Sequence, residues 1–159
     1  MIKVGDRIPS VKLREVTQSG VQEITSDDFF KGKRVALFAV PGAFTSTCSA
    51  KHLPSFANNA DAFKAKGIDA VACTAVNDAA VMRAWSDHSK SAGKVTMLSD
   101  GNADFARALG VDADMSKNGM GVRSRRYSML VDNGVVKELN LEEPGGFGVS
   151  SGEHLLAQI

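Results

Sequence analysis

Two apolar runs of strand length, separated by a helical pattern, constrain the fold of this chain more than any other feature. Residues 34–40 and 69–76 each have the length and composition of a buried strand. The segment between them, from about Ser49 to Ala65, has helical periodicity, and Pro54 predicts a kink in it because proline removes a backbone hydrogen bond. This alternation favours an α/β fold. The helical positions expected to face the core are Phe56, Ala60 and Phe63.

The remaining patterns extend the alternation in both directions and predict one domain, residues 1–159, with a mixed central sheet flanked by helices. An extra N-terminal hairpin is expected from strands 11–16 and 21–25, which turn near Ser19-Gly20. Further expected elements are a helical turn at 27–30, a helix from Asn77 or Asp78 to about Ser89, a strand at 95–98, a helix at 103–109 before Gly110, a hairpin of strands 125–131 and 135–141 around Asp132-Asn133-Gly134, a glycine-rich loop at 142–148, and a helix at 151–158 capped by Ser150 or Ser151.

Composition excludes several classes of partner. The chain has 159 residues, enough for one domain with a substantial core. Its net charge of +1 gives no reason to expect nucleic acid or a membrane surface as a partner. No apolar run approaches the roughly 20 residues that span a bilayer. The N-terminus lacks an apolar signal core and two cysteines are too few for a disulfide-stapled secreted domain, so a cytoplasmic location is expected.

Cys48 has the sequence setting of a reactive thiol. It follows the strand at 34–40 after a short turn and stands where the next helix begins. Free backbone N–H groups and the positive end of the helix dipole meet there, and this setting favours the thiolate, which is the reactive form. Thr45 and Thr47 add hydroxyls that can cap the helix or hold a substrate oxygen. The competing interpretation is a small buried apolar residue, since free cysteine is often buried.

The segment around Cys48 resembles the peroxidatic motif of the peroxiredoxins, specifically the type II or peroxiredoxin-5-like subfamily. Residues 41–49 read Pro-Gly-Ala-Phe-Thr-Ser-Thr-Cys-Ser, and Ser46 replaces the second proline that is usual in that subfamily. Similar segments at matching distances extend the resemblance over essentially the whole chain: Lys51-His52-Leu53-Pro54, Ala75-Val76-Asn77-Asp78, Met82-Arg83-Ala84-Trp85 and Arg126-Tyr127-Ser128-Met129. The resemblance implies a thioredoxin-like fold and a homodimer that forms through the edge near Phe44.

Three further residues are expected to serve Cys48. Thr45 is a plausible partner for the peroxide oxygens. Pro41 has no N–H and a fixed φ, so it can shape the loop and shield the sulfur. A cation near the sulfur would help, and the resemblance selects Arg126, which stands before an aromatic-Ser pair on a strand. Arg123 and Arg125 are interpreted as surface charges.

His52 lies four residues after Cys48, so the two would share a helix face. It could pack near the active site, lie at the dimer contact or tune the thiol. A metal site is not expected, because His88 and His154 show no ligand spacing and are interpreted as solvent-facing. No cofactor is expected either. Gly119-Met120-Gly121 lacks the further glycine and the strand-helix context that a dinucleotide site requires.

The sulfenic acid that peroxide would form on Cys48 must be resolved by a thiol. Cys73 is the only other cysteine, 25 positions later in the second apolar strand, and the region at 146–151 holds none. A disulfide needs the two Cα atoms within about 7 Å, which a helix start and a mid-strand residue need not meet. We therefore favour an external reductant, glutathione with glutaredoxin or thioredoxin, and interpret Cys73 as structural or auxiliary. A Cys48–Cys73 disulfide after local unwinding is the other route.

The leading functional hypothesis is a thiol peroxidase that reduces hydrogen peroxide and small alkyl hydroperoxides. A disulfide reductase is disfavoured, because Lys51 stands where a Cys-x-x-Cys motif would place its second cysteine. The alternative from another class is a peroxide-sensing protein that relays oxidation to a partner. Turnover distinguishes the two, since only an enzyme must consume many equivalents of peroxide.

Overall fold

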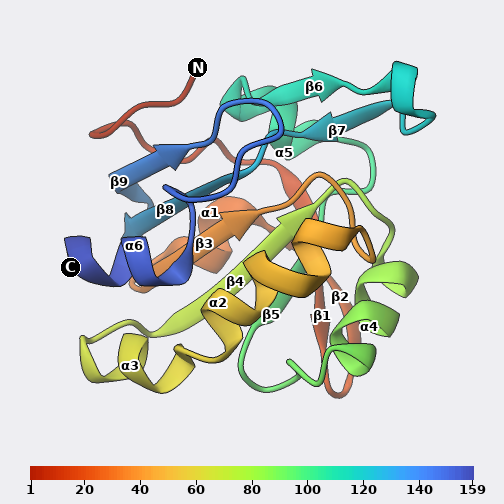
Figure 1. Ribbon diagram of the computed structural model, residues 1–159. Helices are drawn as coiled ribbons and strands as arrows, with labels where there is room; N and C mark the ends of the chain where they lie inside the picture. The colour runs from red at the N-terminus through yellow and green to blue at the C-terminus, as the bar shows by residue number, and fades with distance from the viewer.

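The computed structural model describes residues 1–159, and its centre is a mixed sheet of seven strands in the order β2-β1-β5-β4-β3-β8-β9 (Figure 1). Strands β3, β4 and β5 are parallel to one another, whereas β1 and β8 run antiparallel to their inner neighbours. This topology confirms the predicted α/β class with mixed strand directions. The strands are β1 (Lys12–Thr17), β2 (Gly20–Thr25), β3 (Arg34–Ala39), β4 (Ala70–Ala75), β5 (Thr96–Ser99), β6 (Asp112–Asp114), β7 (Val122–Ser124), β8 (Tyr127–Asp132) and β9 (Val135–Leu141).

The N-terminal hairpin forms as predicted, and β1 pairs with β5, so that β2 becomes an edge strand of the sheet. The sequence patterns did not reveal the short pair β6 and β7, which forms a separate two-stranded sheet. The helical elements are α1 (Ser26–Phe30), the π-helical turn η1 (Cys48–His52), α2 (Leu53–Ala57), α3 (Ala60–Ala65), α4 (Ala79–His88), α5 (Asp104–Leu109), the 3₁₀ turn η2 (Ser116–Asn118) and α6 (Gly152–Gln158). No helix is long and apolar enough to cross a membrane.

The sheet has a hydrophobic core on each face because alternate residues of its central strands point to opposite sides. In β3, Phe38 belongs to one core and Leu37 to the other. The first core contains residues of α2, α3, α4 and α6, and the second contains residues of α1 and α5 (Figure 1). Cys48 lies in the first core. This two-sided packing fixes β3 and β4, whose carboxyl ends lead into the loops that carry the candidate site.

The single kinked helix predicted for residues 49–65 is wrong, because the structure divides it into η1, α2 and α3. Pro54 has no N–H to donate to the preceding turn. Just before it, the Leu53 N–H donates to the Cys48 carbonyl, which makes this turn a wider π turn. The second break falls at residues 58–59, where the Asn59 side chain donates to the Ser55 carbonyl at 2.7 Å. Phe56 and Phe63 are buried as predicted, but Ala60 is half-buried after the break.

Two predicted helix caps are confirmed. The Asp78 carboxylate accepts from the Val81 N–H at 2.8 Å and caps α4. The Ser151 hydroxyl accepts from the His154 N–H at 3.1 Å and caps α6. Both contacts satisfy a backbone donor that the first helical turn leaves without an intrahelical partner.

Candidate functional site

The structure places Cys48 at the first residue of η1, completely buried in the core on one face of the sheet. The loop between β3 and η1 supplies this position, and three contacts hold it. The Ala43 N–H donates to the Asn77 side chain at 2.9 Å. The Ser49 N–H donates to the Thr45 carbonyl at 2.9 Å. The Ser49 hydroxyl accepts from Trp85 Nε1 at 3.0 Å, which ties the turn that carries Cys48 to α4.

Arg126 is the cation in contact with the sulfur. Its Nη2 donates to Cys48 Sγ at 3.1 Å, and its Nη1 lies 2.8 Å from His52 Nδ1. The residue stands one position before β8 begins, not inside the strand as predicted. A guanidinium in hydrogen-bond contact with a sulfur stabilises negative charge on it. The structure therefore joins Cys48, Arg126 and His52, three of the predicted site residues, in one cluster.

His52 is a neutral imidazole with a defined tautomer. Its Nε2 lies 2.9 Å from the Ser150 carbonyl, which can only accept, so Nε2 carries the proton. Nδ1 then accepts from Arg126, which can only donate. Burial, and secondarily the positive charge of Arg126, lower the pKa of His52 to about 3. At neutral pH His52 is consequently an acceptor that orients Arg126.

Thr45 and Pro41 lie in the loop before Cys48, and both are half-buried. The Thr45 hydroxyl donates to the Gly42 carbonyl at 2.7 Å, which leaves its oxygen lone pairs free to accept a hydrogen bond. Neither the Thr45 nor the Thr47 hydroxyl caps η1, so the expectation that these hydroxyls cap the helix is wrong. Gly42 itself is closely surrounded, since a Cβ there would lie 3.3 Å from atoms of Arg123, Met120 and Thr45.

Arg123 and Arg125 are half-buried rather than surface charges, which corrects the prediction. Arg123 donates to the Val76 carbonyl at 3.1 Å and to the Met120 carbonyl at 2.9 Å, and so ties β7 to the end of β4. Arg125 donates to the Glu142 carbonyl at 3.1 Å. Both bond backbone carbonyls, a use of arginine that depends on tertiary contacts and leaves no local signal in the sequence. His88 and His154 are solvent-exposed, as predicted.

Cys73 is completely buried in β4, where its sheet neighbours are Phe38 and Met97. Burial, and secondarily the nearby Cys48, raise the pKa of the Cys73 thiol well above its ordinary value, although Arg126 acts in the opposite direction. The thiol is therefore protonated at neutral pH and packed among apolar side chains. In this conformation it is neither a good nucleophile nor accessible.

Residues 142–150 form a loop that leads from β9 towards α6 (Figure 1). Phe147 from this loop packs against the His52 ring, with 5.2 Å between ring centroids, and lies 6.0 Å from the Arg126 guanidinium. The Glu142 carboxylate accepts hydrogen bonds from Gly148 and Ser150. The sequence predicts only a glycine-rich loop in this region and gives no sign of these contacts.

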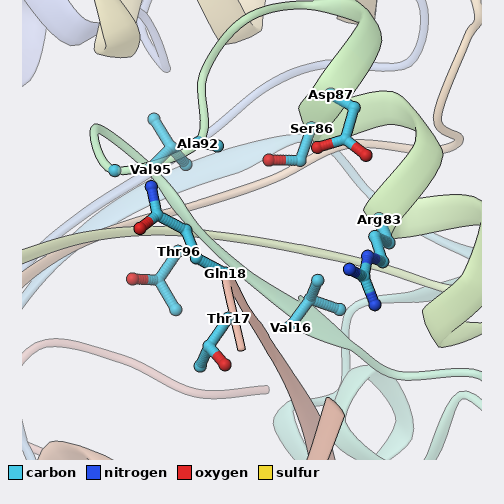
Figure 2. A pocket seen from close by; sticks show the side chains of 10 residues that line it. Val16, Thr17, Gln18, Arg83, Ser86, Asp87, Ala92, Val95 and Thr96 are labelled. Atoms are coloured by element: carbon cyan, nitrogen blue, oxygen red, sulfur yellow. The ribbon is translucent and has the colours of Figure 1, made fainter. Parts of the chain in front are cut away.

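A surface cavity away from this cluster contains none of these residues. It measures about 410 Å³ and lies between the β1–β2 turn, α4 and the segment before β5. Figure 2 shows Arg83 and Asp87 of α4 on one side of it and Thr17 on another. The cavity holds no cysteine or histidine. In addition, no group of three or more His, Cys, Asp or Glu side chains is arranged to hold a metal ion.

Comparison with known proteins relates the whole chain to one family. A family model described as Redoxin matches residues 3–156. The chain is 50% identical to Peroxiredoxin-2E-2, chloroplastic, of Oryza sativa subsp. japonica, over 99% of this chain and 72% of the rice protein. It is 41% identical to Peroxiredoxin-2C of the same plant, over 99% of this chain and 98% of that one.

A solved structure shares the fold almost completely. The crystal structure of reduced Prx3 from Vibrio vulnificus in complex with H₂O₂ superposes with a TM-score of 0.95 and 46% identity, over 99% of each chain. Together with the mixed sheet, this match confirms the thioredoxin-like fold. The chain therefore belongs to the Redoxin family, as a peroxiredoxin of type II, and is a thiol-dependent peroxidase.

Proposed function

We propose that Cys48 reduces hydrogen peroxide and small alkyl hydroperoxides, and that an external thiol then reduces the oxidised cysteine. The Cys48 thiolate attacks the terminal peroxide oxygen. The O–O bond breaks, a new S–O bond leaves the sulfur as sulfenic acid, and the other oxygen leaves as water or an alcohol after it takes up a proton. The observation that carries this proposal is the 3.1 Å contact between Arg126 Nη2 and Cys48 Sγ at the start of a helical turn.

Arg126, Thr45 and Pro41 complete the proposed catalytic group. Arg126 stabilises the thiolate and the charge that develops on the peroxide oxygens. Thr45 accepts a hydrogen bond from the peroxide O–H, because its own proton is directed to Gly42. Pro41 leaves no backbone donor at the start of the loop and restricts its shape. His52 tunes the site through Arg126 and does not act as a base.

Resolution by an external thiol follows from the state of the two cysteines. Cys73 is buried and protonated, so it cannot attack the sulfenic acid from its position in β4. Cys48 is itself 0% exposed, so η1 must open locally before any reductant reaches the sulfur. The incoming thiol forms a mixed disulfide and releases water, and a second thiol then restores Cys48. Glutathione with glutaredoxin, or thioredoxin, supplies these thiols.

A coupled turnover assay tests this function. Hydrogen peroxide consumption is followed with glutathione and glutaredoxin, and separately with thioredoxin, for the wild type, Cys48→Ser and Cys73→Ser. We expect many turnovers in the wild type and in Cys73→Ser, and none in Cys48→Ser. Loss of turnover in Cys73→Ser would show that the internal thiol resolves the sulfenic acid. A single turnover in the wild type with both reductants would favour a sensor over an enzyme.

We also propose a homodimer and a cytoplasmic location. Phe44 is 50% exposed in the loop before Cys48, and its ring lies beside that of His88. Burial of this large apolar side chain against a second copy of the chain would stabilise a dimer. Light scattering on the purified protein is expected to give twice the chain mass, and Phe44→Asp to give the chain mass. Fractionation of cells that produce the protein tests the location.

A further inference from the structure

Glu142 carries a buried carboxylate, and its backbone is hydrogen-bonded to that of Arg126. The residue directly follows β9, and its side chain and backbone together are 7% exposed. Its N–H donates to the Arg126 carbonyl at 3.0 Å, which continues the β8–β9 pairing by one residue. Its own carbonyl accepts from Arg125. The backbone of Glu142 and that of the arginine in contact with the sulfur are thus held together.

The carboxylate of Glu142 closes the 142–150 loop through one oxygen. Oε2 accepts from the Gly148 N–H at 2.6 Å, the Ser150 N–H at 2.9 Å and the Ser150 hydroxyl at 2.7 Å. Burial alone would raise the pKa of Glu142, but these hydrogen bonds outweigh it and hold the pKa below its ordinary value. A buried charge is costly unless it is hydrogen-bonded, and here all three donors come from the loop that the carboxylate closes.

The end of this loop reaches the reactive sulfur through two side chains. Ser150 is completely buried, and its carbonyl accepts from His52 Nε2. This bond fixes the His52 tautomer and directs Nδ1 to Arg126 Nη1, while Nη2 of the same guanidinium donates to Cys48 Sγ. Each contact is between 2.6 and 3.1 Å. The chain of contacts from Glu142 to Cys48 is therefore continuous.

We propose that Glu142 is a positioning residue for the peroxidase reaction, because its carboxylate holds Ser150 where its carbonyl fixes His52, and His52 in turn aims Arg126 at Cys48. The inference rests on the proposed roles of Cys48 and Arg126. Glu142 does not touch the reacting atoms. The remaining backbone contacts in the loop, Gly146 to Glu143 and Ser151 to Gly148, are local, so they do not link the loop to β9 in place of the carboxylate.

The test compares Glu142→Ala with Glu143→Ala, its exposed neighbour in the same loop. The first measurement is the second-order rate constant for reaction with hydrogen peroxide. We expect about a tenfold fall in Glu142→Ala, the size seen when a residue that orients a functional side chain is removed, and no change in Glu143→Ala. The second measurement is the nitrogen-15 NMR spectrum of the histidine rings, with exposed His88 and His154 as internal references. In Glu142→Ala, His52 is expected to lose its single Nε2–H tautomer.

Glu142→Gln separates positioning from simple stability. Its amide oxygen can accept from the same three donors, so the rate constant and the His52 signals should return to near wild-type values. Ser150→Ala removes one of the three donors but keeps the carbonyl, and about a threefold fall is expected by comparison with the tenfold loss. Because Ser150→Ala is the smaller change, it still tests the proposal if Glu142→Ala does not fold. Wild-type rates and wild-type His52 signals in both Glu142→Ala and Ser150→Ala would overturn the proposal. An inactive wild type would instead overturn the function on which it rests.

Discussion

Arg126 contributes both charge and geometry to Cys48, whereas lysine could supply only the charge. The guanidinium donates to Cys48 Sγ and His52 Nδ1 at once, which a single ammonium on a flexible stem does not reproduce. We expect Arg126→Lys to lower the rate constant with hydrogen peroxide about 100-fold, the effect of losing one well-placed donor. Stopped-flow fluorescence of Trp85 measures it. Arg83→Lys, on the exposed side of α4, is the matched control, and an equal rate in both variants would contradict the role of Arg126.

His52 makes the folded protein sensitive to mild acid. The pKa of His52 is about 3 in the folded state and 6.5 in the unfolded chain, so between these two pH values the unfolded chain binds the proton and the folded protein does not. Stability from this group is therefore complete above pH 6.5 and is lost as the pH falls towards 3. Between pH 6.5 and about 5.5 the free energy of unfolding should fall about 1 kcal/mol more in the wild type than in His52→Gln. Urea titrations at the two pH values measure this difference, and equal falls would show that His52 is not buried and neutral.

The contact between α6 and α2 depends on a glycine. A Cβ on Gly152 would overlap with the Ser55 carbonyl, and the Gly152 N–H donates to the Ser55 hydroxyl at 3.0 Å. Gly152→Ala must push the two helices apart, and we expect a loss of at least about 2 kcal/mol of stability. Gly148→Ala is the control, because no atom lies within 4 Å of the added methyl. Similar unfolding midpoints for both variants in thermal or urea denaturation would mean that α6 does not pack on α2 as described.

The sequence predicted the elements whose cause is local. Strands β3 and β4 were found because their apolar runs are long and uninterrupted, and the caps of α4 and α6 because Asp78 and Ser151 act on their own helices. Around α2, the sequence predicted only a kink at Pro54, and neither the π turn before it nor the break at residues 58–59 was found. The first depends on the N–H that Pro54 lacks, and the second on the Asn59 side chain, which donates to the Ser55 carbonyl. A continuous apolar periodicity does not show either.

In the candidate site, too, the residues with a local sequence signal were predicted and those that depend on tertiary contacts were not. The motif around Cys48 and the resemblance led to Thr45, Pro41 and Arg126, because these residues stand in recognisable local patterns. The role of His52 stayed open, since a spacing of four residues from Cys48 cannot show that its ring bonds Arg126 and the Ser150 carbonyl. Glu142 and Arg123 gave no signal. Arg123 bonds a backbone carbonyl distant in the sequence, and the Glu142 carboxylate bonds Ser150 only because the loop after β9 folds back on it.

The two cores share one sheet, and we expect the whole chain to unfold as a single domain. Trp85 lies in one core and Tyr127 in the other, while β3 and β4 contribute side chains to both. If either core were lost, one face of β3 and β4 would be exposed, and the other core depends on the same two strands. Denaturant unfolding followed by Trp85 fluorescence and by far-ultraviolet circular dichroism should give coincident transitions. Two separated transitions would indicate that one core, with its helices, unfolds independently.

The reaction of Cys48 with peroxide is tested most directly by the mass of the intact chain. The reduced protein is treated with one equivalent of hydrogen peroxide before the mass is measured. We expect the gain of one oxygen atom in the wild type and in Cys73→Ser, and no change in Cys48→Ser. A loss of two hydrogen atoms in the wild type would reveal a Cys48–Cys73 disulfide and contradict resolution by an external thiol. An unchanged wild-type mass would contradict the assignment of Cys48 as the residue that reacts with peroxide.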